Sequence, residues 1–187
     1  MVVTLRPETF DDWPWLWHWR HELRDPEWKE WDSPYLHALS PRLSYEQFTR
    51  GRALDNHLGA VIDVDGRAVG YVNRGELAPR GGGWWDWGIV IYDPADRGRG
   101  TGRAAARLWI DHTFTMTGVH VLTLTTWSGN TPMISLGHSL GFAECSRIPQ
   151  AREWRGQRYD AVQMALVRDD WVVRNDGDSP HEQPTAS

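Results

Sequence analysis

One stretch of this 187-residue chain limits its fold more than any other: an apolar run, a glycine-rich turn and an alanine-rich run in immediate succession. Residues 84–92 predict a strand, and residues 102–117 predict a helix that ends at Gly118. The first N–H groups of a helix are unpaired and carry a partial positive charge, and glycines let an anion come close to them. We therefore expect a site for a phosphate-bearing cofactor at the turn.

Two common phosphate-binding motifs do not fit this turn. Counted from Gly98, the dinucleotide fingerprint G-x-G-x-x-G requires a third glycine at the position of Arg103. The P-loop requires a Gly-Lys pair, and the sequence contains none. The pattern that remains is R-x-x-G-x-G, from Arg97 to Gly102. A turn that only allows tight packing of the helix on the strand is the alternative to an anion site.

The R-x-x-G-x-G pattern resembles the acetyl-CoA motif Q/R-x-x-G-x-G/A of the GCN5-related N-acetyltransferase (GNAT) superfamily. Asn130 followed by Leu140-Gly141-Phe142 resembles the N…LGF signature of that family. Residues 93–96 resemble the family's approach to the turn. Residues 152–160 resemble the closing hairpin of the branch that contains ribosomal-protein N-terminal acetyltransferases. The detailed resemblance covers residues 84–171, and the order of elements extends it over the whole domain.

This resemblance implies acetyl-CoA as the co-substrate. It implies that the amides of the turn bind the pyrophosphate, that the strand pairs with the pantetheine amides, and that Asn130 hydrogen-bonds the pantetheine arm. The residues expected to bind acetyl-CoA are Ile89, Val90, Ile91, Arg97, Gly98, Arg99, Gly100, Thr101, Gly102 and Asn130.

The implied reaction is direct attack of a primary amine on the acetyl thioester in a ternary complex. Asp86 is the candidate base, because strand alternation places it on one face with Gly88, Val90 and Tyr92, and relatives often carry a glutamate on this strand. A strand N–H near Ile91 is expected to stabilise the oxyanion. A cap or an ion pair with an arginine is the alternative role for Asp86.

Gly137 departs from the family pattern, because many members carry a tyrosine there as general acid to the leaving thiolate. His138 is the candidate replacement, with Tyr92 and water as the other options. A thiol with a pKa of about 8.5 leaves tolerably without a proton donor, so the departure does not exclude catalysis. For His138, a solvent-exposed position on the helix is the alternative interpretation.

The N-terminal third is rich in aromatic residues, with six of the 13 tryptophans between Trp13 and Trp31. Relatives form the acceptor pocket in this region, and aromatic walls beside acidic residues suit a cationic amine. The expected acceptor pocket consists of Trp17, Trp28, Trp31 and Tyr35. The acceptor is a small molecule or a protein N-terminus. Plain core packing or a contact in a homodimer, which the family resemblance suggests, is the alternative role for these aromatic residues.

The predicted fold is an α/β (α+β) mixed sheet flanked by helices, in the order β-α-α-β-β-β-α-β-α-β-β. A capping box at Ser44 and Gln47 predicts a helix up to about residue 54. Asp65-Gly66 predicts a hairpin between strands at residues 57–64 and 68–76. Further strands are expected at residues 119–127, 142–148 and 159–167. A single acetyltransferase domain over residues 1–171 and a disordered tail over residues 172–187 complete the prediction.

The bulk composition excludes several other classes of protein. A formal charge of −5 argues against nucleic acid as a partner. The single Cys145 allows no internal disulfide, which favours a cytoplasmic protein, and no signal peptide or membrane span is expected. His18 and His21 have no third ligand nearby in sequence, so no metal site is expected. A non-catalytic acyl-CoA-binding module and a tryptophan-rich interaction protein are the alternatives to an enzyme.

Overall fold

The computed structural model describes residues 1–54 and 57–177, and this part of the chain contains one sheet of seven strands. The strand order is β1-β2-β3-β4-β5-β7-β6, with β4 and β5 parallel and the other neighbours antiparallel. The strands are β1 (Val3–Arg6), β2 (Gly59–Val64), β3 (Arg67–Glu76), β4 (Trp84–Ile91), β5 (Val121–Trp127), β6 (Ala143–Trp154) and β7 (Gln157–Val167). The predicted mixed sheet is confirmed.

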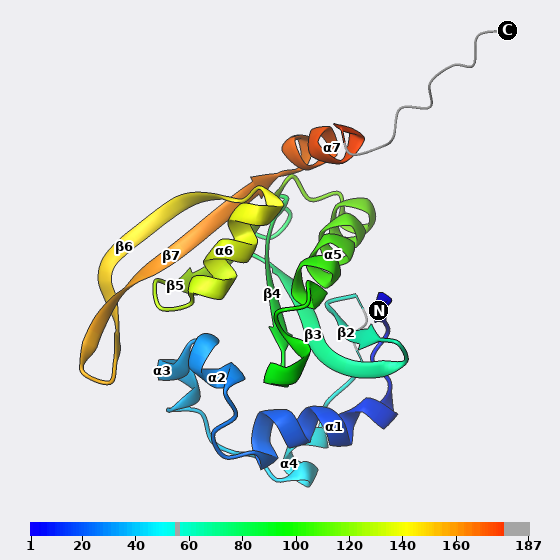
Figure 1. Cartoon of the computed structure of the whole chain (residues 1–187), viewed down its shortest axis with the longest axis vertical. Helices are drawn as coiled ribbons and strands as arrows, with labels where there is room; N and C mark the ends of the chain where they lie inside the picture. The colour runs from blue at the N-terminus through cyan, green and yellow to red at the C-terminus, as the bar shows by residue number, and fades with distance from the viewer. Residues whose placement is uncertain (55–56, 178–187) are drawn as a thin grey trace, which may run out of the picture.

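The helices divide into two groups, and Figure 1 shows α5 and α6 in front of the strands and α1 to α4 gathered at one end of the molecule. Long helices α5 and α6 follow β4 and β5, and α7 follows β7. Short helices α1 to α4, with the π-helical turn η2, precede the hairpin of β2 and β3. The bounds are α1 (Trp13–Trp17), η2 (His18–Glu22), α2 (Trp28–Trp31), α3 (Pro34–His37), α4 (Tyr45–Thr49), α5 (Thr101–Thr117), α6 (Thr131–Leu140) and α7 (Arg168–Gly177).

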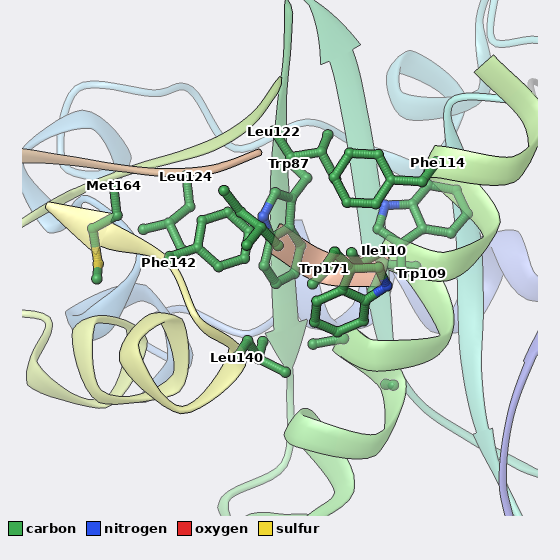
Figure 2. Packing of buried hydrophobic residues seen from close by; sticks show 14 of the residues in the cluster. Trp87, Trp109, Ile110, Phe114, Leu122, Leu124, Leu140, Phe142, Met164 and Trp171 are labelled. Atoms are coloured by element: carbon green, nitrogen blue, oxygen red, sulfur yellow. The ribbon is translucent and has the colours of Figure 1, made fainter. Parts of the chain in front are cut away.

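Alternate side chains of β4 point to opposite faces of the sheet and pack in two separate hydrophobic cores. Trp87 and its neighbours on the same face pack in the larger core beneath α5 and α6, together with Trp109 and Phe142 (Figure 2). Val90 packs against the smaller core, where Trp13, Leu16, Trp28, Phe48 and Tyr92 are buried. The sheet is therefore covered on both faces, and β4 is the strand that both cores share.

The two parallel strands separate soon after they meet. β4 pairs with β5 only from Trp84 to Asp86, opposite Val121 to Thr123, although both strands continue beyond that point. Their outer edges remain paired, β4 with β3 and β5 with β7. The inner backbone edges of residues 87–91 and 124–127 therefore have no strand partner in the described chain.

The local predictions in the first half of the chain agree with the structure in most places. Ser44 Oγ accepts from the N–H of Gln47 at 3.2 Å, and the Gln47 side chain accepts from the N–H of Ser44 at 2.9 Å. The predicted hairpin turns at residues 65–66. The helix after the capping box is shorter than predicted, because Arg50 is extended and Gly51 has a φ of 72°, which ends the helix after Thr49.

The chain continues as a helix past the predicted domain boundary at residue 171. Trp171 of α7 is buried, and its Nε1 donates to Asp111 Oδ1 of α5 at 2.6 Å. One buried tryptophan thus docks a segment in which the two valines, Val172 and Val173, are exposed. The boundary falls inside α7, and residues 178–187 of the predicted tail lie outside the described part.

Arg74 of β3 is buried without a carboxylate partner in the described structure. Its guanidinium donates to the carbonyl of His57 at 2.8 Å and to Thr113 Oγ1 at 2.9 Å, and it contacts His112 Nδ1 at 3.3 Å. The ring of Trp109 lies 4.6 Å from the guanidinium. Burial lowers the pKa of Arg74 and of His112, and the charge of Arg74 lowers the pKa of His112 further. A neutral imidazole accepts from an arginine, whereas a protonated one repels it.

We predict that the free energy of unfolding falls as the pH is lowered through this group. The pKa of His112 is lower in the folded protein than its ordinary value of 6.5. The neutral imidazole therefore contributes fully to stability above pH 6.5, and this contribution is lost as the pH falls through the lowered pKa. Chemical denaturation between neutral and mildly acidic pH measures the effect. His112→Gln keeps a hydrogen-bond acceptor but cannot be protonated. The free energy of unfolding of this variant should therefore depend less steeply on pH. An equal slope in both proteins would contradict the prediction.

Candidate active site

A cavity of about 350 Å³ opens where β4 and β5 separate. Its walls come from both strands, the glycine-rich turn, the first turn of α5, α6 and the short helix α2. The lining residues are Trp28, Trp31, Asp32, Ser33, Trp87, Gly88, Ile89, Val90, Ile91, Arg97, Gly98, Gly100, Gly102, Arg103, Thr125, Thr126, Asn130, Pro132, Met133 and Leu136. Eight of the ten residues expected to bind acetyl-CoA line this one cavity: Ile89, Val90, Ile91, Arg97, Gly98, Gly100, Gly102 and Asn130.

Two of the three glycines of the turn allow its backbone conformation, and the third leaves open space at the start of α5. Gly98 and Gly100 have φ angles of 76° and 83°, in the left-handed region that favours glycine, and Gly100 is the N-cap of α5. Gly102 has no such angle, and a Cβ built on it would meet no protein atom within 4 Å. Neither backbone strain nor packing therefore requires Gly102. It leaves space at a helix N-terminus that has no side-chain cap, which fits an anionic group of a bound molecule.

Arg97 holds the turn and α2 together. Its guanidinium donates to the carbonyls of Ile91 at 3.0 Å and Tyr92 at 3.1 Å, and to Glu27 Oε1 at 2.9 Å. Arg97 therefore acts chiefly as a brace, although it also lines the cavity. Sequence reasoning missed Arg103, which lines the cavity from the first turn of α5.

Arg99 and Thr101 do not line the cavity, although both were expected to bind acetyl-CoA. Arg99 is exposed on the turn beside it. Thr101 is buried, 3% exposed.

Asn130 caps α6 at the opposite wall. Its Oδ1 accepts from the N–H of Met133 at 3.2 Å, and its own N–H donates to the carbonyl of Trp127 at 2.9 Å. The side-chain oxygen is thus committed to the cap, and Nδ2 has no partner in the described chain. The cap fixes a hydrogen-bond donor at the cavity wall.

Asp86 lies at the point where the strands separate. Thr123 Oγ1 donates to its carboxylate at 2.7 Å, and Thr125 Oγ1 lies 3.4 Å from the same oxygen. Burial raises the pKa of Asp86, and the two hydroxyl contacts partly oppose this. No arginine pairs with Asp86 in the described residues. Asp86 itself is not part of the cavity wall, but its partner Thr125 is.

The structure does not bring His138 to the cavity. His138 is exposed on α6, and it is not among the residues that line this cavity. Gly137 faces the sheet instead, where a Cβ would lie 2.9 Å from Met164 Sδ and 3.1 Å from Leu124 Cδ2. The missing side chain at residue 137 lets α6 pack closely on the sheet.

Tyr92, the other candidate proton donor from the sequence, is 1% exposed. Its hydroxyl accepts from Arg20 Nε at 2.7 Å, and burial raises its pKa. Tyr92 is thus part of the smaller core, against the rings of Trp15, Trp19 and Trp28.

The aromatic residues expected in the acceptor pocket separate into three places. Trp28 and Trp31 line the cavity. Trp17 does not, since its Nε1 donates to the carbonyl of Leu43 at 2.9 Å and its ring packs on Tyr45. Tyr35 lines a neighbouring cavity of about 420 Å³, where its hydroxyl accepts from Arg152 Nε at 3.1 Å.

The neighbouring cavity adjoins the first one at a shared wall. Ser33, Thr125 and Thr126 line both of them. The remaining lining residues come from α3 and from the hairpin of β6 and β7, which Figure 1 shows as a long arm beside α2 and α3. Two cavities therefore meet at Thr125, next to Asp86.

A family model for the acetyltransferase (GNAT) domain matches residues 3–143. The chain belongs to the GNAT acetyltransferase family. The GNAT fold and the assignment to N-acetyltransferases that the sequence motifs implied are thereby confirmed, and acetyl-CoA is the co-substrate of this family. No curated protein matches the chain.

Solved GNAT structures share the fold over nearly the whole chain. Spermidine N-acetyltransferase from Vibrio cholerae, solved with CoA and spermine, has a TM-score of 0.74 at 17% identity, covering 91% of this chain and 98% of that one. Ribosomal-protein-alanine N-acetyltransferase from Brucella melitensis has a TM-score of 0.66 at 23% identity, covering 89% and 99%. A GNAT acetyltransferase from Bacillus anthracis has a TM-score of 0.71 at 14% identity, covering 90% and 96%.

Among the described residues, no helix has the length and apolar character that crossing a membrane requires.

The tight packing at Gly137 gives a prediction for this GNAT domain. Gly137→Tyr, which introduces the tyrosine of many relatives, should destabilise the fold by about 1–3 kcal/mol, because overpacking displaces Met164 and Leu124. Chemical denaturation measures this cost. His138→Tyr adds the same side chain at the exposed neighbouring position and should change stability by no more than about 0.5 kcal/mol. Equal stability of the two variants would contradict the packing argument.

The open space at Gly102 gives a second prediction. Gly102→Leu should weaken CoA binding by about tenfold or more, while Gly102→Ala should have a smaller effect. The leucine occupies space that no protein atom fills, so neither variant should lower the thermal unfolding temperature. Calorimetric titration with CoA measures the affinity. If the leucine variant binds CoA as tightly as the original protein, the glycine-rich turn is not the CoA site.

Proposed function

We propose that this GNAT domain transfers an acetyl group from acetyl-CoA to a primary amine, on a small molecule or a protein N-terminus, by direct attack in a ternary complex. The observation that carries this proposal is the pair of cavities that meet at Thr125. One ends at a glycine-lined helix N-terminus, which suits a phosphate. The other opens towards the arm of β6 and β7, which suits a second reactant.

The residues of the first cavity fit acetyl-CoA along its length. The amides at Gly98 to Gly102 would hold the pyrophosphate, and the unpaired edge of β4 would pair with the pantetheine amides. Asn130 Nδ2 would donate to the same arm from the opposite wall. When bound, acetyl-CoA supplies an acetyl group that is activated as a thioester.

The backbone of β4 offers a donor at the reacting end. The N–H of Tyr92 donates to Val69 in β3 at 3.1 Å, so strand alternation turns the N–H of Ile91 towards the gap between β4 and β5. A fixed N–H in a site shielded from water stabilises negative charge on an oxygen better than water does. Ile91 is our candidate oxyanion donor.

Asp86 is our candidate base, and it would act through Thr125 or a water molecule. An attacking amine must lose a proton, and the Asp86 carboxylate is oriented towards Thr125 by two threonine contacts. Burial raises the pKa of Asp86, which makes it a stronger base than an exposed aspartate. Because His138 faces away from the cavity, the leaving thiolate departs without that proton donor, as its low basicity permits.

We predict that Asp86→Asn lowers kcat by about 100-fold or more, within the range that general bases contribute. The variant keeps an acceptor for Thr123, so the fold should be retained. The acidic limb of the pH–rate profile should also disappear, because in the original protein activity is lost as the pH falls through the raised pKa of Asp86. An unchanged acidic limb would rule out Asp86 as the base.

The proposed activity itself is tested by following free thiol during incubation with acetyl-CoA and a panel of amines. The panel contains polyamines, amino acids and peptides with free N-termini. Amine-dependent release of thiol supports the enzyme. Tight binding of acetyl-CoA with no amine-dependent release would favour the alternative of a non-catalytic acyl-CoA-binding module, for which the exposed position of His138 is the supporting observation.

A further inference from the structure

A third cavity, of about 310 Å³, lies on the far side of α2 from the acetyl-CoA cavity. It is bounded by η2, α2, α3, the segment 40–42 and Trp154 of the β6–β7 arm. Its lining residues are Arg20, His21, Arg24, Asp25, Pro26, Lys29, Glu30, Pro34, His37, Ala38, Ser40, Pro41, Arg42 and Trp154. We call it the basic cavity, because four of these residues are cations and two are carboxylates.

The four cations of the basic cavity have no carboxylate partner within ion-pair distance in the described chain. Arg20 donates to the Tyr92 hydroxyl at 2.7 Å. Arg42 donates to the backbone carbonyls of His21, at 2.8 Å, and Glu22. The side chains of Arg24 and Lys29 have no hydrogen bond to a described residue, and the Lys29 ammonium lies 5.6 Å from the centre of the Trp28 ring. The chain has 25 acidic and 20 basic side chains, so a cluster of four cations without carboxylate partners is unusual in it.

The carboxylates of the basic cavity do not neutralise it. Glu30 pairs with Arg155 of the β6–β7 arm at 2.8 Å, so its charge is already balanced by a residue outside the cavity. Asp25 is the second carboxylate, and its attraction has a smaller effect on the pKa of Lys29 than either burial or the charge of Arg42. Burial and the charge of Arg42 outweigh it and lower the pKa of Lys29. His21 also has a lowered pKa, from burial and from Lys29, Arg20 and Arg42.

Positive charges that repel one another inside a cavity are stabilised by an anion. Lys29 reaches the cavity as a compact ammonium, whereas Arg24 offers a planar fork that matches the oxygens of a phosphate. The volume is within the range of small-molecule sites and exceeds what a single inorganic ion needs. We propose that the basic cavity binds a small molecule through a phosphate-type oxyanion, at a site separate from acetyl transfer.

The helix α2 forms the partition between this site and the first cavity. Trp28 and Trp31 line the acetyl-CoA cavity, three residues apart on one side of the helix, and Lys29 and Glu30 line the basic cavity. An anion held by Lys29 therefore also holds the helix that carries Trp28 and Trp31. This placement distinguishes the basic cavity from the glycine-rich turn, whose phosphate site lies at the N-terminus of α5.

Calorimetric titration of the full chain with inorganic phosphate and with pyrophosphate tests the proposal. Saturating CoA is present throughout, so that the glycine-rich turn is already occupied. We expect binding of one equivalent, and Arg24→Gln with Lys29→Gln should weaken it by about tenfold or more, as expected for the loss of charge-assisted contacts. Arg50→Gln changes an exposed arginine that directly follows α4 and pairs with Glu46, so it is the matched control and should leave the affinity unchanged.

Two further measurements keep the test decisive. Arg24 is exposed, so Arg24→Gln alone should remain folded and should still weaken phosphate binding even if the double variant is unstable. Citrate at the same concentration separates phosphate recognition from general anion attraction, and we expect it to bind more weakly. The proposal is overturned if neither phosphate nor pyrophosphate binds the CoA-saturated protein, or if Arg24→Gln and Arg50→Gln bind them equally.

Discussion

The end of pairing between β4 and β5 after three residue pairs is the constraint on which this structure depends. Parallel strands normally continue to pair, since buried backbone groups without partners cost free energy. Here the unpaired edges instead face a cavity, and the outer edges stay paired with β3 and β7, so the strands remain fixed while they separate. The opening therefore has rigid walls, which an extended ligand arm with its own amides can complete.

The sequence predicted the part of this site that depends on local signals. The glycine-rich turn lies between a strand and a helix, and its positive φ angles at Gly98 and Gly100 favour glycine, so the motif and the geometry coincide. The N-cap at Asn130 is likewise local, because it bonds to Met133 only three residues further along. Motif spacing is a reliable guide where one backbone segment makes the whole contact.

Contacts between distant segments were not predictable in this way. Arg97 reads as a phosphate ligand in the motif, yet it also braces Glu27, 70 residues away in the sequence. His138 and Gly137 are adjacent, and only the rotation of α6 on the sheet decides that the glycine faces Met164 and the histidine faces solvent. The tryptophans at residues 13, 15, 17 and 19 alternate along the sequence, which fits the period of a strand and also the two faces of a helix. Both of their helical faces are covered, so neither period alone shows which partner each ring has.

The position of α2 decides the shape of two cavities, and aromatic contacts hold it more firmly than charges do. The ion pairs of Glu27 and Glu30 are partly exposed, and exposed pairs contribute at most about 1 kcal/mol each.

Trp28, by contrast, is 6% exposed, and its Nε1 donates to the carbonyl of Trp19 at 3.1 Å. Burial of a large aromatic side chain contributes about 1.5–3 kcal/mol, and its loss costs more when a cavity remains. Trp127 of β5 adds a hydrogen bond to the carbonyl of Trp31 at 2.9 Å. The tryptophans are therefore structural first. By anchoring a helix of only four residues, they separate the cavity between β4 and β5 from the basic cavity.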